Sequence, residues 1–483
     1  MTLGTIMKIW IRRFSLTALC IIVISGTVGY ADTVSKNAFP SPDRIHYKKL
    51  NFNLPDTQRV VLENGMVLYI MENHELPIIN IGALVKTGSL YDPEGKAGVA
   101  ELTTYLMRTG GTLKLKSDEI DKRLDVMAAS ASIGTSIESA QVNLSVLTEN
   151  LDPTLDILAQ MLIEPAFEQD KLELARQLKI EELRRIKDDP QKMAFREFNR
   201  LIFAKDPRGH LSSIKSLTHI TRNDLMDFHQ RFFLPNNIIF AVSGDISKED
   251  AVKTFNRHFG TWKRSHEAVN MIPPSQQPAK GMFCVNKAIP QSTIVTGQFT
   301  IGKNHPDFYA YTVLDFITGS GGFSSRIFSA VRNNEGLAYS AGSFYRARPA
   351  YGIFGAYAFT KSSSTEKTLS LINSILDVVR SGSITTHELA WAKKSINNGF
   401  VFSFDTPEQV VWQQMNLEYE NLPTDFLMNY RKNIEDVTLK DVNTVAAKYL
   451  DKSKNVVLIL GDSKNFDKPV TPKNRMVYIV PEE

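Results

Sequence analysis

The sequence predicts an α+β protein built from two homologous halves, each with mostly antiparallel sheets flanked by helices. Three observations support this prediction. Strand-like apolar runs alternate with longer helical segments, a proline-rich segment separates two parts of similar length, and one pattern of cap, helix, strand and turn occurs twice. The chain has 483 residues, of which 43% are hydrophobic and 22% charged, and these values exclude a fully disordered chain.

The first half begins with strands and continues with helices. Residues 59–70 form the predicted hairpin, with its turn at Asn64-Gly65, and residues 78–85 form a further apolar strand. Helical patterns follow at residues 95–108, 117–128, 153–163 and 168–187. The last of these helices has a strongly charged face.

A repeat relates the two halves. Thr221 precedes a helical stretch in the first half and Thr438 in the second, 217 residues later, and each is followed after three residues by an Asp. This Thr-x-x-Asp start resembles a capping box, with Asp where Glu or Gln is usual. An apolar strand and a Gly-Asp turn complete both copies. The shared order indicates duplication, with residues 32–262 and 281–483 as the halves and residues 263–280 as the linker.

Residues 1–31 have the features of a secretory signal peptide. A basic start ends at Arg13, an apolar run covers residues 14–28, and small residues precede a cleavage point after Ala31. The alternative is an uncleaved membrane anchor, but a run of about 15 residues is short for a span of about 20. We therefore expect a periplasmic or secreted protein with no stable membrane span. Cleavage leaves Cys284 as the remaining cysteine, which we expect to be a buried small hydrophobe.

The charge of the chain gives no reason to expect a nucleic-acid partner. Lys and Arg number 56, against 52 Asp and Glu. Residues 1–31 contain three of the basic residues and no acidic residue, so the rest of the chain is nearly neutral. A protein that binds nucleic acid through its phosphates is expected to be clearly basic, with a basic patch or stripe.

Residues 88–112 provide a specific resemblance. They read G-S-L-Y-D-P-E-G-K-A-G-V-A-E-L-T-T-Y-L-M-R-T-G-G-T. With the loop at residues 206–210 and the segments at 336–340 and 421–425, they resemble the pitrilysin/insulinase family of zinc metallopeptidases. That family includes the mitochondrial processing peptidase and the core proteins of the respiratory cytochrome complex. The resemblance runs from about residue 50 to about residue 465 and implies a processing-peptidase-like fold of two related halves.

The zinc motif of that family is absent. Its peptidases carry H-x-x-E-H, in which two His bind zinc and the Glu activates water. The matching residues here are Glu101, Thr104 and Tyr105, in the places of the first His, the Glu and the second His. Thr cannot act as a general base, and neutral Tyr is a poor zinc ligand. Glu181 or Glu182 stands where the family's distal Glu would fall, although both are also typical of a solvated helix face.

We therefore expect no metal or other cofactor in this chain, and we expect zinc in a partner subunit. The nine histidines include no pair at H-x-x-E-H or H-E-x-x-H spacing. A site assembled from distant residues stays open as an alternative. The sequence also lacks a G-x-S-x-G nucleophile elbow, a P-loop and a dinucleotide-binding fingerprint.

The second half keeps a different part of the family pattern. Residues 324–332 are predicted to form a helix that ends near Gly336, and a strand follows directly. Arg332 and Tyr339 match the Arg and Tyr that the family's peptidases supply to the substrate at the zinc. Both side chains can donate hydrogen bonds to a peptide carbonyl or to an oxyanion. The alternative is a surface Arg at a helix C-terminus and a half-buried Tyr.

A glycine-rich stretch, G-S-G-G-F, precedes this helix and contains Gly319, Gly321 and Gly322. The non-zinc subunit of the processing peptidase has a glycine-rich loop that helps to handle substrate. The resemblance therefore implies a substrate-binding role for these glycines. The alternative is a simple turn that leads into the helix.

The leading hypothesis is a non-zinc subunit of an exported heterodimeric zinc metallopeptidase. It would supply Arg332 and Tyr339 to extended or unfolded peptides in the active site of a homologous H-x-x-E-H partner, and it would not be a peptidase on its own. The first alternative is a catalytically inactive peptide-binding or structural protein, like the family's core proteins. The second alternative is an autonomous hydrolase with an unrecognised site.

Overall fold

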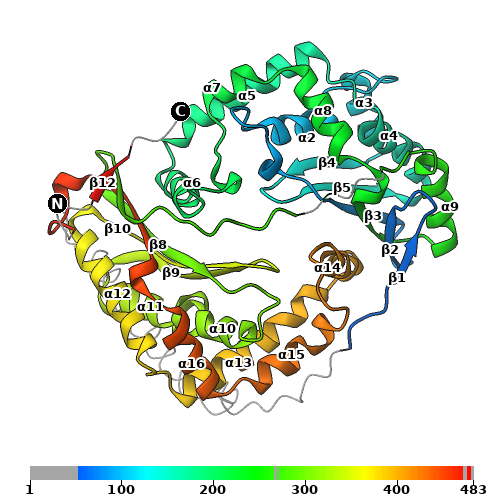
Figure 1. Cartoon of the computed structure of the whole chain (residues 1–483). Helices are drawn as coiled ribbons and strands as arrows, with labels where there is room; N and C mark the ends of the chain where they lie inside the picture. The colour runs from blue at the N-terminus through cyan, green and yellow to red at the C-terminus, as the bar shows by residue number, and fades with distance from the viewer. Residues whose placement is uncertain (1–52, 266–268, 270, 471–475, 480–483) are drawn as a thin grey trace, which may run out of the picture. The chain divides into compact units, whose positions relative to one another are not determined.

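The computed structural model describes residues 53–265, 269, 271–470 and 476–479 (Figure 1). The predicted signal peptide and its cleavage point lie outside these residues. Leu54–Glu483 forms one compact unit that contains both halves. Within the described residues, no helix has the length and apolar character needed to cross a membrane.

In the described part of the first half, six strands form one sheet in the order β1-β2-β6-β3-β5-β4. Among these strands only β2 and β6 pair in parallel, so the prediction of a mostly antiparallel sheet is confirmed. The hairpin between β1 and β2 turns at Gly65, whose φ of 87° is readily adopted by glycine. The strands are β1 (Gln58–Val61), β2 (Val67–Glu72), β3 (Ile78–Val85), β4 (Ser130–Thr135), β5 (Ala140–Leu147) and β6 (Ile238–Gly244).

The helices of the first half confirm the four predicted helical segments as α2 to α5. Helix α2 begins four residues later than expected, because Gly98 has a φ of 112° and ends the preceding turn. The helices are α2 (Val99–Thr109), α3 (Ser117–Val126), α4 (Leu151–Ile163), α5 (Gln169–Ile186), α6 (Pro190–Ile202), α7 (Ile214–His219), α8 (Arg222–Phe232) and α9 (Lys248–Phe259).

The described part of the second half forms a sheet in the order β12-β7-β11-β8-β10-β9. Its strands are β7 (Gly281–Asn286), β8 (Gln291–Thr300), β9 (Ala338–Ala347), β10 (Gly352–Lys361), β11 (Val456–Gly461) and β12 (Met476–Tyr478). Its helices are α10 (Phe308–Asp315), α11 (Arg326–Phe328), α12 (Thr365–Arg380), α13 (Thr386–Phe400), α14 (Pro407–Tyr419), α15 (Phe426–Asp436) and α16 (Leu439–Tyr449). Cys284 is buried in β7, as predicted, and burial raises the pKa of its thiol to about 11.

The two capping boxes predicted from the repeat are present. At the start of α8, the Thr221 side chain accepts from the Asp224 amide and the Asp224 side chain accepts from the Thr221 amide. Thr438 and Asp441 make the same pair of bonds at the start of α16. The sequence pattern therefore identified two equivalent helix starts in the two halves.

Helix α6 of the first half packs on β8 and β11 of the second half, while α14 of the second half packs on β2, β3 and β6 of the first (Figure 1). The two helices start at Pro190 and Pro407, which are also 217 residues apart. They are therefore equivalent helices exchanged between the halves. Glycines permit the contact, since a Cβ on Gly82 would lie 2.7 Å from the ring of Trp412 in α14.

A buried ionic cluster joins the two halves and the segment between them. The Arg208 guanidinium donates to Glu138 at 2.6 Å and to Asp206 at 3.0 Å, and the Arg208 side chain is 1% exposed. Tyr351 of the second half donates to Glu138 at 3.0 Å, and the backbone amide of Ser275 donates to Asp206 at 2.8 Å. Buried charges are costly unless they are paired and hydrogen-bonded. Since the partners in this cluster come from both halves and the linker, the cluster favours one relative position of these three parts.

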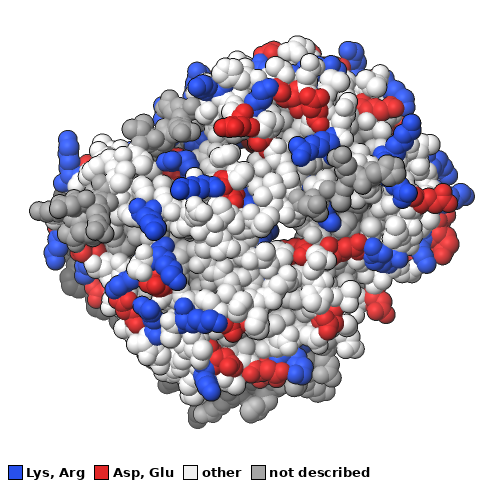
Figure 2. All heavy atoms as spheres, viewed as in Figure 1, with Lys and Arg blue, Asp and Glu red and all other residues white. Residues whose placement is uncertain are grey.

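Acidic and basic side chains are interspersed on the face shown in Figure 2. This distribution agrees with the near balance of 56 basic and 52 acidic residues. The predicted site residues therefore lie in two different places, one on α2 and α5 in the first half and one around the start of β9 in the second.

Candidate functional site

Asp92 holds the start of α2. Its carboxylate accepts hydrogen bonds from the backbone amides of Gly98 and Ala100, both at 2.7 Å. Burial raises the pKa of Asp92 to about 7, although these two amides act in the opposite direction. The helix that would carry a zinc motif is therefore firmly positioned at its N-terminus.

The side chains at the positions of the zinc motif are used for other contacts. Glu101 forms an ion pair with Lys179 of α5. The Thr104 hydroxyl donates to the backbone oxygens of Ala100 at 3.0 Å and Glu101 at 3.1 Å, so its hydrogen bonds are made within α2. Tyr105 is 44% exposed. These three side chains supply one carboxylate, one hydroxyl that is already bonded and one phenol.

The two candidates for the distal Glu have different partners. Glu182 lies 2.9 Å from the ammonium of Lys179, whereas Glu181 lies 2.6 Å from the guanidinium of Arg184 on the same helix. Burial acts to lower the pKa of Lys179, but the charges of Glu101 and Glu182 outweigh it and the pKa is raised. Lys179 is therefore a cation at the α2–α5 contact.

These residues do not fit a zinc ion. Zinc prefers His nitrogen, Cys sulfur and carboxylate oxygen, usually with at least three protein ligands. Here the carboxylates of Glu101 and Glu182 are shared with an ammonium group, and no imidazole stands beside them in α2. In the described ranges, no group of three or more His, Cys, Asp or Glu side chains is arranged to hold a metal.

The structure brings Arg332 and Tyr339 together. The guanidinium carbon of Arg332 lies 4.8 Å from the centre of the Tyr339 ring, and Tyr339 is 83% exposed. The helix expected at residues 324–332 is present in part: Gly322–Ser324 is a 3-10 turn, Ser325 is extended, and α11 continues directly into π turns at Ser329–Asn334. Gly336, with φ 61°, then turns the chain into β9. Tyr339 is thus exposed, and not half-buried as the alternative required.

Two further aromatic rings surround Arg332, and sequence reasoning did not identify them. The guanidinium carbon lies 5.3 Å from the centre of the Phe323 ring and 5.0 Å from that of Phe328. Phe323 is 68% exposed, and its ring packs on Phe328 with centres 4.7 Å apart. Rings at this distance attract a cation and limit its rotamers, so they hold the guanidinium beside Tyr339. Phe323 directly precedes the predicted helix and Phe328 lies within it, four residues before Arg332, and this helical spacing is the signal that could have indicated Phe328.

The three glycines have local structural explanations. A Cβ on Gly319 would lie 2.2 Å from the backbone nitrogen of Ser343, and one on Gly321 would lie 2.6 Å from both the backbone oxygen of Phe316 and the Trp391 ring. Gly322 has a φ of 72° and open space around its Cβ position. Close packing accounts for Gly319 and Gly321, and backbone conformation accounts for Gly322. A role in substrate binding stays a prediction for all three.

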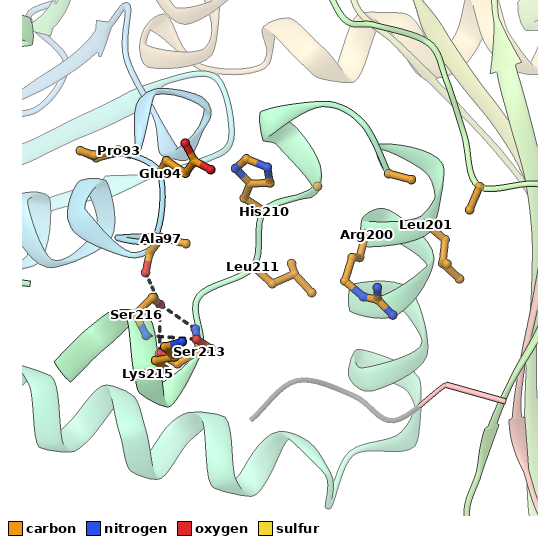
Figure 3. Close-up of a pocket in the computed structure, with 14 residues that line it drawn as sticks. Pro93, Glu94, Ala97, Arg200, Leu201, His210, Leu211, Ser213, Lys215 and Ser216 are labelled. Atoms are coloured by element: carbon orange, nitrogen blue, oxygen red, sulfur yellow. Dashed lines mark hydrogen bonds between the residues drawn. The ribbon is translucent and has the colours of Figure 1, made fainter. Parts of the chain in front are cut away.

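A cavity of about 510 Å³ lies elsewhere, between the loop before α2, the end of α6 and the loop before α7. Its lining includes Glu94, Arg200, His210 and Lys215, which Figure 3 shows around the opening. Ser216 on its wall donates to the backbone oxygen of Ala97 at 2.7 Å. Neither Arg332 nor Tyr339 lines this cavity, so the candidate site is the exposed Arg–Tyr pair and not a closed pocket.

Comparisons with known proteins agree with both halves of this architecture. A family model described as insulinase (peptidase family M16) matches residues 68–211, and one described as the peptidase M16 inactive domain matches residues 219–396. Together these two models match more than half of the chain. The chain belongs to the M16 insulinase/pitrilysin family. The match to the inactive-domain model begins before the linker, in α7 of the first half.

Relatives of this M16 protein carry two kinds of names. An uncharacterized zinc protease of Mycobacterium leprae is 24% identical over 404 residues, which cover 82% of this chain and 89% of the relative. A protein of Helicobacter pylori named as a non-peptidase homolog is 25% identical over 377 residues, which cover 77% of this chain and 86% of the relative. The family therefore includes proteins named as proteases and at least one named as a non-peptidase.

Solved structures share the fold. A peptidase M16 inactive domain from Pseudomonas fluorescens superimposes with a TM-score of 0.77 at 24% identity, covering 84% of this chain and 98% of that protein. A protease from Helicobacter pylori gives a TM-score of 0.76 at 23% identity, covering 84% and 100%. These similarities confirm the predicted α+β architecture with its two related halves.

Proposed function

We propose that this M16 protein is the non-zinc subunit of an exported heterodimeric metallopeptidase. In this proposal it contributes Arg332 and Tyr339 to a peptide held in the active site of a homologous partner that carries H-x-x-E-H and zinc. The chain is not a peptidase by itself. The predicted signal peptide, residues 1–31, directs it to the periplasm or outside the cell.

The observation that carries the proposal is the exposed pairing of Arg332 with Tyr339, 4.8 Å apart. A guanidinium offers five hydrogen-bond donors and a phenol offers one. Donors aimed at a carbonyl that becomes an oxyanion stabilise the transition state, and loss of one such donor typically costs about 10²- to 10³-fold in rate. In the described part of the first half no set of side chains is arranged to hold the zinc that would use these donors within the same chain, so we assign the metal to a partner.

The proposed substrate is an extended or unfolded peptide. Tyr339 lies near the start of β9, which is an edge strand of the sheet in the described residues. An edge strand has main-chain groups that can pair with an added peptide strand, and such pairing tolerates many sequences. Pairing of a peptide main chain with β9 is compatible with the proposed role of Arg332 and Tyr339, because both would also donate hydrogen bonds to main-chain carbonyls of the peptide.

The second candidate is a peptide-binding or structural protein with no part in proteolysis. The name of the Helicobacter relative, a non-peptidase homolog, favours it. Under this proposal the edge of β9 binds peptides or another protein, and Arg332 and Tyr339 contribute affinity only. Because a shared fold does not determine function, the two candidates must be separated by experiment.

The test is reconstitution with purified proteins. The mature chain, the H-x-x-E-H chain encoded nearest to it, and an equimolar mixture are each incubated with a mixture of unfolded peptides, with and without a zinc chelator. The proposal expects the two chains together to cleave the peptides, and neither chain to cleave them by itself. The zinc chelator should abolish this cleavage. Peptide binding without cleavage in any mixture would favour the second candidate, and chelator-resistant cleavage by this chain alone would contradict both.

A further inference from the structure

Lys179 connects two positions that the M16 pattern reserves for metal ligands. Its ammonium hydrogen-bonds to Glu101 of α2 and lies 2.9 Å from Glu182 of its own helix α5. The Lys179 side chain is 16% exposed, so the ammonium is largely withdrawn from solvent. Glu101 replaces the first His of the motif, and Glu182 is one of the two candidates for the distal carboxylate.

We infer that the Lys179 ammonium takes the structural place of the metal, tying α2 to α5 and keeping divalent cations out. In a zinc site, one cation joins a ligand of the first helix to a carboxylate of the second. Here a covalently attached cation makes the same connection between the same two helices. The contact needs no cofactor, because the charge belongs to the chain.

Electrostatics explains why the ammonium excludes a metal. A protonated lysine has donors but no lone pair, so it cannot become a ligand. A divalent ion at Glu101 and Glu182 would lie within a few ångström of the Lys179 ammonium, and at so short a distance the repulsion persists although the two carboxylates are 42% and 69% exposed. Zinc would therefore have to displace Lys179 before it could share these carboxylates. Lys179 therefore opposes zinc binding in addition to the absence of imidazole ligands in α2. This effect does not depend on whether a partner subunit exists.

The inference predicts that restoring the motif alone is not enough. One variant carries Glu101→His, Thr104→Glu and Tyr105→His, and a second variant carries these three changes together with Lys179→Met. Methionine has a similar length and a high helix propensity but no charge. Each protein is stripped of metal, and its zinc affinity is measured by competition with a chromophoric chelator. Circular dichroism checks that both variants are folded.

The expected result is a zinc affinity about 10- to 100-fold higher in the variant that lacks Lys179, which is the range for groups adjacent to metal ligands. Lys171→Met in the restored motif is the matched control, because Lys171 also lies in α5 but pairs with Asp118 of α3, which is not at a metal-ligand position. Equal zinc affinities with and without Lys179, including no binding by either variant, would overturn the exclusion of metal.

A second measurement tests the connection between the helices in the otherwise unchanged chain. Thermal unfolding is compared for Glu101→Gln, Lys179→Met and the double variant. Lys179→Met is expected to lower Tm by about 2–4 °C. Adding Glu101→Gln should then cost little more, because the pair is already broken. Fully additive losses of Tm would overturn the role of Lys179 as a bridge, even if the restored variants do not fold.

Discussion

The Arg332 guanidinium lies 4.8 Å from the centre of the Tyr339 ring, although a helix end and a glycine turn separate the two residues in sequence. The same guanidinium also faces Phe323 at 5.3 Å and Phe328 at 5.0 Å. Three rings around one cation restrict its rotamers without occupying its hydrogen-bond donors. The arrangement leaves a preorganised pair of donors on an exposed surface, which is what a substrate-binding role in another subunit's active site requires.

The contact between Gly82 of β3 and Trp412 of α14 should tolerate no added methyl group. Gly82→Ala would place Cβ 2.7 Å from the Trp412 ring, and overpacking of this kind typically costs about 1–3 kcal/mol of unfolding free energy. In a Trp412→Leu background the same change should cost clearly less. Urea unfolding of the four proteins measures the coupling.

Gly134→Ala is the matched control for this prediction. Gly134 lies in β4 of the same sheet, and no atom lies within 4 Å of its Cβ position. The change should be neutral or slightly stabilising, because alanine lowers the entropy of the unfolded chain. Similar losses for Gly82→Ala and Gly134→Ala would show that the exchanged helix does not restrict Gly82.

Removal of Arg208 should destabilise the whole chain. Arg208→Met removes the buried guanidinium shared by Glu138 and Asp206, although Glu138 keeps a pair with the half-exposed Arg348 at 3.2 Å, and breaking a buried pair in this way typically costs about 3–5 kcal/mol. Arg123→Met is the control, since Arg123 pairs with Glu119 on an exposed face of α3 and such pairs contribute about 0–1 kcal/mol. Chemical denaturation measures both, and equal small losses would contradict the structural role of the cluster.

Asp315 should make stability fall as pH rises. Burial raises the pKa of Asp315 to about 6, against an ordinary value of 3.8, although Ser343 donates to its carboxylate at 2.6 Å. A raised pKa means that the folded state binds the proton more tightly. This contribution to stability is fully present below pH 3.8 and is lost as pH rises through about 6.

The measurement is the difference in unfolding free energy between the unchanged protein and Asp315→Asn at a series of pH values. Other titrating groups are common to both proteins and largely cancel. The unchanged protein should lose stability relative to Asp315→Asn between about pH 4 and about pH 7. A difference that does not change with pH would mean that Asp315 ionises in the folded state at its ordinary pKa.

The sequence predicted the repeated parts of the fold because local patterns determine them. The capping boxes at Thr221 and Thr438, the hairpin turn at Gly65 and the strand that became β3 each follow from neighbouring residues. The α+β class followed from the same patterns. The Arg332–Tyr339 pair was identified from the family resemblance, and in the structure one helix end and one turn bring both residues to the start of β9.

Other features depend on contacts between distant residues, and no local pattern indicates them. The exchange of α6 and α14 rests on side chains such as Trp412 that pack on the sheet of the other half. The link from Lys179 to Glu101 spans 78 residues and appears in sequence only as one more charge on a charged helix face. Arg332 lies within the π turns of Ser329–Asn334, and these turns help to place it among its aromatic neighbours. The spacing of apolar residues in the sequence does not predict π turns.

The most direct test of the central claim is the peptidase activity of the reconstituted mixture after Arg332→Ala and Tyr339→Phe are introduced together. Tyr339→Phe keeps the ring and removes only the hydroxyl donor. The matched control is Arg231→Ala, because Arg231 is also stacked on an aromatic ring, that of Phe232 at 4.9 Å, but belongs to the first half. The account predicts that kcat falls by at least about 10²-fold in the double variant while the control stays near the unchanged protein. Unchanged activity in the double variant, or an equal loss in the control, would contradict it.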